Sequence, residues 1–307
     1  MPYLEQLTLR LAHGIAALPE ATRARHASYL LTAQRDDGGF AGREGGSDLY
    51  YTGFALRGLA ILGELHGATA RKAAGFLQSR MQGQESIVDF LSLIYGGKLL
   101  ELAAGVDVFG SADSGWKEAV AAALLKFRRT DGGFAKGAEG VASSTYHTFL
   151  MLLCFELLDL SVPEPEGIVT FLKTQQAAEG GFLEIRAQKR AGTNPTAAAI
   201  ASLRLLAALD ENTRLDTIDF LLDLTTDEGG FRANTRIPIA DLLSTFTALL
   251  TLQDLGGINE VDTAHVLRFV QSLEQESGGF HGAAWDPAHD VEYTFYGLGC
   301  LALLRKE

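Results

Sequence analysis

A Gly-Gly-Phe motif recurs along the chain at a nearly constant spacing, and this period constrains the fold more than any other feature. The phenylalanines of the motif are Phe40, Phe134, Phe182, Phe231 and Phe280. They are separated by 94, 48, 49 and 49 residues. The first gap spans two periods, which predicts an intervening repeat without the motif, and the segment that begins at Phe76 fits it with a shortened loop. The pattern indicates six repeats of one unit that pack on their neighbours.

Each repeat is expected to supply two helices, and a leading helix over residues 3–18 precedes the first repeat. The apolar positions of that leading segment recur every three or four residues, which is helical spacing. The expected first helices span residues 21–34, 68–82, 115–129, 163–176, 212–226 and 261–275. The expected second helices span residues 48–65, 86–103, 144–160, 195–209, 241–255 and 290–304. Because the second helices are apolar on all sides, we expect them to form a buried inner layer.

The repeats run from one end of the chain to the other, so residues 1–307 are expected to form a single domain. A formal net charge of −12 argues against binding along a nucleic-acid backbone, which calls for a clustered positive face. No stretch approaches the ~18 apolar residues of a membrane span, and the N-terminal segment lacks a basic start followed by an apolar run. We therefore expect a cytoplasmic protein without a membrane span and without a nucleic-acid partner.

Five of the second helices open with a threonine at the same phase of the repeat. These threonines are Thr52, Thr148, Thr196, Thr245 and Thr294, and four residues earlier stand Asp48, Ser144, Gly192, Asp241 and Asp290. An Asp or Ser at this position accepts hydrogen bonds from the free N–H groups of the first helical turn, so helix capping explains most of this column. The paired glycines are expected to end each first helix, because glycine adopts left-handed backbone angles without a side-chain clash.

Two repeats carry the ungapped spacing aromatic-Leu-x3-Gln-x3-Gly-x-Phe, from Tyr29 to Phe40 and from Phe171 to Phe182. This spacing resembles the QW-type motif of squalene cyclases and their relatives. With its six helix pairs, the chain resembles over nearly its full length the toroid shared by terpenoid cyclases and the β subunits of protein prenyltransferases. In size and loop pattern it is most similar to the prenyltransferase β subunit. The resemblance implies an all-α fold, an (α/α)6 toroid with a central aromatic-lined cavity.

The resemblance to protein prenyltransferases also implies a catalytic zinc, held by Asp and Cys at the start of the fifth second helix and by His at the start of the sixth. Asp241 occupies the Asp position, but Leu243 stands at the Cys position and Tyr293 at the His position. Neither Leu nor a neutral Tyr ligates zinc, so we expect no zinc at the family site. The carboxylates Asp290 and Glu292, which Asp241 could approach, are ligands of the type that Mg²⁺ prefers. A capped helix beside a solvated loop is the alternative explanation of these carboxylates.

A diphosphate pocket in the loops of repeats four and five is a further implication of the resemblance. Those loops carry the cations Arg186, Lys189, Arg190, Arg232 and Arg236. They would lie beside helix N-termini, where backbone dipoles favour an anion, although surface charges that keep the protein soluble would also explain them. Aromatic and polar residues at the starts of the second helices would contact the isoprenoid chain, or simply pack in the core. These residues are Tyr51, Tyr146, His147, Tyr293 and Tyr296.

Three functions remain open from the sequence, and an enzyme is favoured. The leading one is transfer of a prenyl group from an isoprenoid diphosphate, with Asp241, Asp290 and Glu292 as catalytic groups and with the acceptor and any partner subunit left open. The second follows from the resemblance to squalene and class II diterpene cyclases, in which the position of Glu292 holds the acid that protonates the polyene. The third is a non-catalytic module that binds an isoprenoid or a protein.

Overall fold

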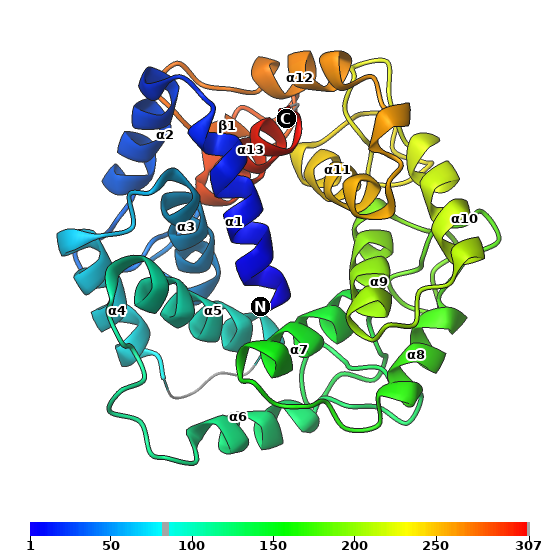
Figure 1. Cartoon of the computed structure of the whole chain (residues 1–307), viewed down its shortest axis with the longest axis horizontal. Helices are drawn as coiled ribbons and strands as arrows, with labels where there is room; N and C mark the ends of the chain where they lie inside the picture. Colours follow the sequence, from blue (N-terminus) through cyan, green and yellow to red (C-terminus); the bar gives the residue numbers. More distant parts are fainter. Residues whose placement is uncertain (82–85, 306–307) are drawn as a thin grey trace. The chain divides into compact units, whose positions relative to one another are not determined.

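The computed structural model describes residues 1–81 and 86–305, and within them the chain is helical apart from one short pair of strands. A leading helix, α1 (Tyr3–Ala16), precedes six helix pairs (Figure 1). The first helices are α2 (Glu20–Thr32), α4 (Gly67–Ser79), α6 (Trp116–Leu125), α8 (Pro165–Thr174), α10 (Glu211–Leu222) and α12 (Thr263–Ser272). The second helices are α3 (Leu49–Leu62), α5 (Ile87–Ala104), α7 (Thr145–Leu157), α9 (Thr193–Leu205), α11 (Leu242–Leu255) and α13 (Val291–Leu303). A 3-10 helix, η1 (Ile258–Glu260), follows α11, and strands β1 (Phe280–His281) and β2 (His289–Asp290) pair antiparallel before α13.

The leading helix and the six predicted helix pairs are confirmed, with ends that differ from the expected ones by at most four residues. The end of the first helix expected over residues 68–82 and the shortened loop of the second repeat fall on residues 82–85, which lie outside the described residues. The prediction that the paired glycines end the first helices is wrong, because α8 ends at Thr174, well before Gly180. A tight loop separates them, in which Gln176 and Phe182 form a β-bridge and the Gly180 N–H donates to the Ala177 carbonyl over 3.0 Å.

The described helices fall into two compact units. Unit one comprises Met1–Trp116 and Val270–Glu307, and in it α3 packs between α5 and α13, with α1 against α3 and α13. Unit two comprises Lys117–Phe269, and in it α9 packs between α7 and α11, with α8 against α9 and α10 against α11. The second helices of consecutive repeats are therefore neighbours within each unit. The expectation of a single domain stays a prediction.

The Gly-Gly pairs are required by the close approach of the next repeat. Gly180 has φ +92°, and a Cβ there would lie 2.3 Å from the backbone oxygen of Asp216 in α10. A Cβ on Gly181 would lie 2.4 Å from the ring of Phe220, the aromatic residue in the same helix. Any larger residue would push the two repeats apart, so the aromatic residue and the glycines of the motif are two halves of one contact between repeats.

The threonine column has a structural cause that the sequence did not reveal. In four of the five repeats that carry the column, the threonine hydroxyl accepts a hydrogen bond from the backbone N–H of the Gly-Gly-Phe phenylalanine in its own repeat. The distances are 2.9 Å for Thr52 and Phe40, 3.0 Å for Thr148 and Phe134, 2.8 Å for Thr196 and Phe182, and 3.0 Å for Thr245 and Phe231. All these residues are completely buried. An unsatisfied buried N–H costs about 1–3 kcal/mol, so the threonine fixes the loop to its second helix.

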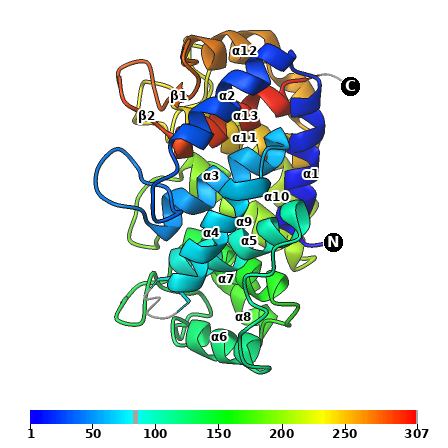
Figure 2. The same cartoon turned by 90° about the vertical axis from the view of Figure 1, so that its left-hand side faces the viewer.

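The last repeat packs directly against the first within unit one. His26 of α2 is completely buried, and its Nδ1 accepts a hydrogen bond from the Gly279 N–H over 3.1 Å. Glu274 forms an ion pair with Arg25, and its Oε1 accepts a hydrogen bond over 3.0 Å from Nε2 of His26, whose pKa is lowered by burial. Figure 1 shows the red helix α13 beside the blue helices α1 and α3, in agreement with their packing. In Figure 2 the loop before α3 and the strands before α13 project to the same side, away from the N-terminus of α1. These two loops carry the polar cluster of unit one.

Candidate functional site

Helix capping accounts for most of the residues four positions before the threonines, as predicted. The carboxylates of Asp48, Asp241 and Asp290 and the hydroxyl of Ser144 each accept a hydrogen bond from a backbone N–H in the first turn of the helix that follows. Gly192 provides no side-chain cap to α9. In α9 the residue whose N–H would be capped is Pro195, which has no N–H to donate.

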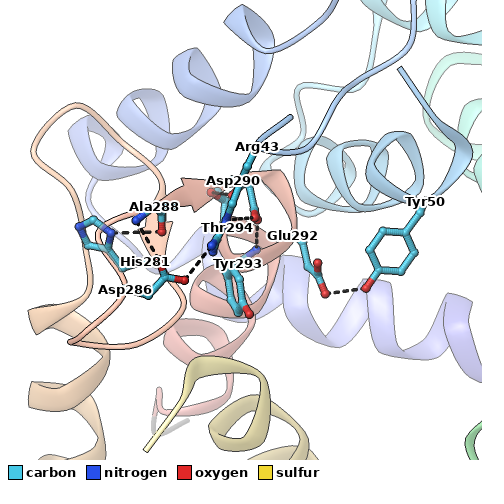
Figure 3. Close-up of polar contacts among 9 residues, drawn as sticks. All are labelled: Arg43, Tyr50, His281, Asp286, Ala288, Asp290, Glu292, Tyr293 and Thr294. Carbon is cyan, nitrogen blue, oxygen red and sulfur yellow. Dashed lines mark hydrogen bonds and ion pairs between the residues drawn. The ribbon is translucent and has the colours of Figure 1, made fainter. Parts of the chain in front are cut away.

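In unit one, Arg43 binds two carboxylates beside the N-terminus of α13 (Figure 3). Its Nη1 donates to Asp286 Oδ2 over 2.8 Å, and its Nε donates to Asp290 Oδ2 over 3.0 Å. The guanidinium lies 5.3 Å from the centre of the Tyr293 ring. The other oxygen of Asp290 accepts from the Tyr293 N–H over 2.9 Å, and the Asp290 side chain is only 4% exposed. One oxygen of Asp290 is therefore in an ion pair and the other caps α13, and its catalytic role stays a prediction.

Glu292 is the protonatable carboxyl of this region. The Tyr50 hydroxyl donates to Glu292 Oε1 over 2.6 Å (Figure 3). Burial raises the pKa of Glu292, and the Tyr50 hydrogen bond opposes the rise. Tyr50 belongs to an aromatic cluster, in which ring centres lie 5.0–5.8 Å apart. The members of the aromatic cluster are Tyr50, Tyr51, Phe54, Phe295 and Tyr296. Together they place a carboxyl of raised proton affinity beside electron-rich rings.

A small polar cavity of about 240 Å³ lies where the first and last repeats meet. Tyr29, Arg35, His289 and Asp290 are among the residues that line it. Burial raises the pKa of Tyr29 to about 12, and the negative charge of Asp290 contributes to the rise. The volume lies below the roughly 300–1,000 Å³ of pockets that hold drug-sized ligands, so a long isoprenoid chain does not fit here.

In unit two, the predicted cations lie on two adjacent loops over residues 183–191 and 232–240. Thr145 and Thr193 hold these loops through their N–H groups, which donate to Glu184 and Ala233 carbonyls over 2.9 Å. Each loop thus lies across the N-terminus of the preceding second helix. The Arg190 guanidinium donates to the Thr235 hydroxyl over 3.0 Å and links the two loops.

The cations of these loops are for the most part without anionic partners. Within residues 1–81 and 86–305, the side chains of Arg186, Lys189 and Arg236 have no ion-pair or hydrogen-bond partner. Arg232 donates to the Asp223 carbonyl over 3.0 Å, and its Nε is buried without a partner in the described chain. Arg186, Lys189 and Arg236 are exposed, so they are accessible to an anion, although exposed surface charges need no partner.

The ligand set expected for zinc does not fit. Both oxygens of Asp241 accept from Ser244, Oδ1 from the backbone N–H and Oδ2 from the hydroxyl, each over 2.7 Å. Burial raises the pKa of Asp241, which disfavours the charged form that a metal needs. In the part of the chain that the structure describes, no three or more His, Cys, Asp or Glu side chains are grouped to hold a metal. The sequence-based expectations about zinc and Mg²⁺ stay predictions.

One polar cluster of unit two was only partly foreseen from the sequence. His147 was expected to contact substrate, and the structure brings it together with Ser144 and Glu184. The neighbouring Tyr146 is 38% exposed and meets the His147 ring edge-on at 5.5 Å. The spacing of Ser144 and His147 was visible as part of a helix cap. Glu184 comes from the loop of the next repeat, and nothing in the sequence indicates how that loop registers on α7.

The predicted site residues therefore fall into two groups. Unit one holds Tyr51, Asp290, Glu292, Tyr293 and Tyr296, and of these Asp290 and Tyr293 share Arg43 while Tyr51 and Tyr296 belong to the aromatic cluster. Unit two holds Asp241, Tyr146, His147 and the five loop cations.

The family model described as prenyltransferase alpha-alpha toroid domain matches residues 9–92, 99–194 and 195–307. Among solved structures, Candida albicans protein geranylgeranyltransferase-I complexed with GGPP aligns with a TM-score of 0.73 at 17% identity, covering 92% of this chain and 90% of that one. The R337A variant of the type II terpene cyclase MstE from Scytonema, in complex with geranylgeranyl dihydroxybenzoate, aligns with a TM-score of 0.62 at 14% identity, covering 98% of this chain and 99% of that one.

The α-1,6-mannanase GH76A of Salegentibacter sp. HEL1_6 also aligns, with a TM-score of 0.63 at 14% identity over 93% of this chain and 99% of that one. No curated protein sequence matches the chain. At such identities these similarities show the fold alone, which the three enzymes share although their names refer to different substrates. None of the helices in the described part of the chain combines the length and the apolar character that a membrane crossing needs. The all-α toroid predicted from the repeats is confirmed.

Proposed function

Because the chain belongs to the prenyltransferase alpha-alpha toroid family, we propose that it binds an isoprenoid diphosphate and transfers the prenyl group to an acceptor. The observation that carries the proposal is the set of unpaired cations on two adjacent loops of unit two, Arg186, Lys189 and Arg236, in a chain of net charge −12. A diphosphate carries several negative charges and accepts hydrogen bonds from such groups.

The local backbone supports the same ligand. The N-terminus of α9 lies between the two cationic loops, and Gly192 leaves it without a side-chain cap. The Thr193 N–H is bonded to the Ala233 carbonyl and Pro195 has no N–H, so it is the positive end of the helix dipole that favours an anion there. The geranylgeranyltransferase-I of similar fold was solved with GGPP, which motivates the isoprenoid class of the ligand. Charge and backbone therefore agree on a diphosphate, while the length of the isoprenoid chain is left to the experiment.

Proton-initiated cyclisation is the second candidate, and Glu292 is the observation that favours it. A neutral Glu292 would donate its proton to a terminal alkene, the aromatic cluster would stabilise the resulting carbocation, and loss of a proton from the cyclic cation would end the reaction. The diphosphate would remain attached to the product. Prenyl transfer, in contrast, releases diphosphate.

Incubation with geranylgeranyl diphosphate, with and without Mg²⁺ and cell extract, distinguishes the candidates by mass spectrometry of lipid and protein fractions. Release of diphosphate with a prenylated product supports transfer. An isomeric cyclic diphosphate that disappears in Glu292→Gln supports cyclisation. Tight binding without turnover rejects both reactions and leaves a binding module, and absence of binding rejects the proposed ligand.

The cation site is tested by calorimetry with the same ligand. We expect Arg186→Gln/Lys189→Gln to weaken binding by at least tenfold, since two charge-assisted contacts are lost. The matched control is Arg204→Gln/Arg214→Gln, which removes the same charge from unit two. Arg204 lies in the last turn of α9 and Arg214 donates to the Leu255 carbonyl at the end of α11, so both are remote from the loops. Equal weakening in the two variants would reject the site.

A further inference from the structure

Three side chains meet at the start of α7, next to the cationic loops. The Ser144 hydroxyl lies 2.7 Å from His147 Nδ1 and accepts a hydrogen bond from the His147 backbone N–H over 3.0 Å. The same hydroxyl donates to Glu184 Oε1. The second oxygen of Glu184 accepts from the Tyr146 N–H over 3.3 Å. We refer to Ser144, His147 and Glu184 as the relay cluster.

The hydrogen bonds of the Ser144 hydroxyl determine which nitrogen of the His147 ring carries the proton. A hydroxyl has one hydrogen to donate and two lone pairs that accept. With Glu184 ionised, the Ser144 hydrogen goes to the carboxylate, and the two lone pairs accept from the His147 backbone N–H and from His147 Nδ1. The imidazole then carries its proton on Nδ1 and a lone pair on Nε2. Within residues 1–81 and 86–305, Nε2 has no hydrogen-bond partner.

The surroundings keep this imidazole neutral. Burial lowers the pKa of His147 to about 4, and the charge of Lys136 contributes to the fall. Burial raises the pKa of Glu184, while the hydrogen bonds from Ser144 and Tyr146 oppose the rise. At neutral pH, Nε2 is therefore an acceptor.

The relay cluster and the cations share one loop. Glu184 lies two residues before Arg186 and six before Arg190, and the loop is fixed to α7 because the Thr145 hydroxyl donates to the Leu183 carbonyl over 2.6 Å. Reactive groups for an acceptor and for a leaving diphosphate are thus on the same segment of unit two.

We propose that His147 Nε2 is the group that binds a protic acceptor, a hydroxyl or a thiol, and takes up its proton during prenyl transfer, with Ser144 and Glu184 as positioning residues. The inference rests on the proposed transferase function. It names the substrate class of the acceptor, which must carry an O–H or S–H hydrogen.

The reaction balances as follows. The bond between prenyl C1 and the diphosphate oxygen breaks, and its electron pair leaves with the diphosphate held by the loop cations. The acceptor oxygen or sulfur forms the new bond to C1, and its proton moves to His147 Nε2. The Nδ1–H of the resulting imidazolium donates to Ser144, whose hydroxyl is bonded to the Glu184 carboxylate. The imidazolium returns to the neutral state by giving the Nε2 proton to diphosphate or water.

The tautomer is measured on the ligand-free protein by long-range ¹H–¹⁵N NMR with ¹⁵N-labelled histidine. We expect His147 to carry its proton on Nδ1 at pH 7. In Glu184→Gln the carboxylate that accepts the Ser144 hydrogen becomes an amide, which can either accept from or donate to Ser144. We therefore expect a mixture of the two His147 tautomers in this variant. A wild-type signal with the proton on Nε2 overturns the inference without bearing on diphosphate binding.

Kinetics use geranylgeranyl diphosphate with phenol, N-acetylcysteine or water as acceptor, and diphosphate release is measured. His147→Asn keeps an amide nitrogen at the place of Nδ1 but lacks Nε2, whereas His147→Gln restores a polar group at the place of Nε2. We expect kcat to fall about 100-fold or more in both variants, because neither amide takes up a proton, with an unchanged Kd for geranylgeranyl diphosphate and a lower KM for the acceptor in His147→Gln than in His147→Asn. A wild-type rate in His147→Asn overturns the inference and leaves the transferase intact.

Ser144 also caps α7, and a matched variant separates that role from positioning. Ser86 caps α5 in the same way, accepting from the Asp89 N–H over 3.2 Å. We expect Ser144→Ala and Ser86→Ala to lower Tm alike, and only Ser144→Ala to lower kcat and change its pH profile. If both variants leave kcat unchanged, Ser144 is a cap alone and the relay cluster is refuted. Wild-type protein that fails to bind geranylgeranyl diphosphate refutes the proposed function itself.

Discussion

The repeat places a polar loop at the same position in both units, but the cations of the two loops differ in whether they have carboxylate partners. In unit one, the cation Arg43 is held by Asp286 and by the buried Asp290, so the cluster satisfies its own charge. In unit two, Arg186 and Lys189 occupy a corresponding loop and have no partner within the described residues. The comparison teaches that the repeat fixes where a loop lies, while a few side chains decide whether it stabilises the fold or is left to bind a ligand.

The largest expected effect comes from breaking the frame that the two units share. Gly180→Ala in unit two and Gly278→Ala in unit one should each lower the free energy of unfolding by about 3–5 kcal/mol, because strain at positive φ adds to a clash with the next helix. The added Cβ would lie 2.3 Å from the Asp216 oxygen and 2.6 Å from the Arg25 oxygen. Urea denaturation measures the loss, with Gly105→Ala, which meets no atom within 4 Å, as the control expected to lose about 1–2 kcal/mol.

The next effect separates the two charge patterns. Arg43→Met should lower the free energy of unfolding by about 2 kcal/mol, because it leaves the Asp290 carboxylate buried without its ion partner, while partial exposure of Arg43 screens part of the loss. Arg186→Met should change the free energy of unfolding by less than about 0.5 kcal/mol. Urea titrations of both variants provide the values. Equal losses would remove the distinction between a satisfied and an available cation.

Inorganic diphosphate tests the same distinction from the ligand side. At tenfold excess over its Kd, a ligand of the native state stabilises by about 1.4 kcal/mol, which raises Tm by a few degrees in a protein of this size. Scanning calorimetry should show this rise in the wild type and in Arg43→Met. The rise should be absent in Arg186→Gln/Lys189→Gln. A rise that persists in the double variant would place the anion elsewhere.

The smallest expected effect is the pH dependence contributed by Glu292. Because its folded-state pKa is raised by burial, the folded protein holds the proton more tightly, and stability is lost as pH rises through the window above the ordinary carboxyl pKa. Glu292→Gln stays neutral, so it should be more stable than wild type at pH 8, with the difference closing below pH 4. Asp210→Asn should show the opposite sign, because the Thr213 N–H lowers the pKa of Asp210. Urea denaturation at a series of pH values measures both.

The fold was predictable because the repeat is marked by glycines and threonines that other residues cannot replace without a clash or a lost hydrogen bond. A glycine where a loop meets the next helix and a threonine at the start of the second helix recur in five of the six repeats, so the order and pairing of the helices followed from their spacing. The helix ends were predicted less well. The sequence shows no break between the helix and the tight loop that contains Gln176, because that residue pairs with Phe182 only once the chain has turned.

The candidate sites were predictable by composition but not by geometry. The cations of the two loops were recognisable because they stand out in an acidic chain. The role of Glu184 depends on the register of one repeat against the next, which is set by hydrogen bonds from the Thr145 N–H and hydroxyl rather than by local sequence. Asp290 and Asp241 were expected as catalytic groups, and this stays a prediction. The hydrogen bonds that Asp290 accepts from Arg43 and Asp241 accepts from the Ser244 N–H are visible only in the folded structure.

The contact between the last repeat and the first has a consequence for the newly made chain. The hydrogen bond from Gly279 to His26 joins residues 253 positions apart. At a synthesis rate of about 5–20 residues per second, the first repeat waits about 10–50 s on the ribosome before its partner emerges. During that interval the face that will receive the last repeat, including the ring of Tyr29, is exposed to other nascent chains and to chaperones. The first repeat is therefore the part of the chain that spends the longest time without its final neighbour.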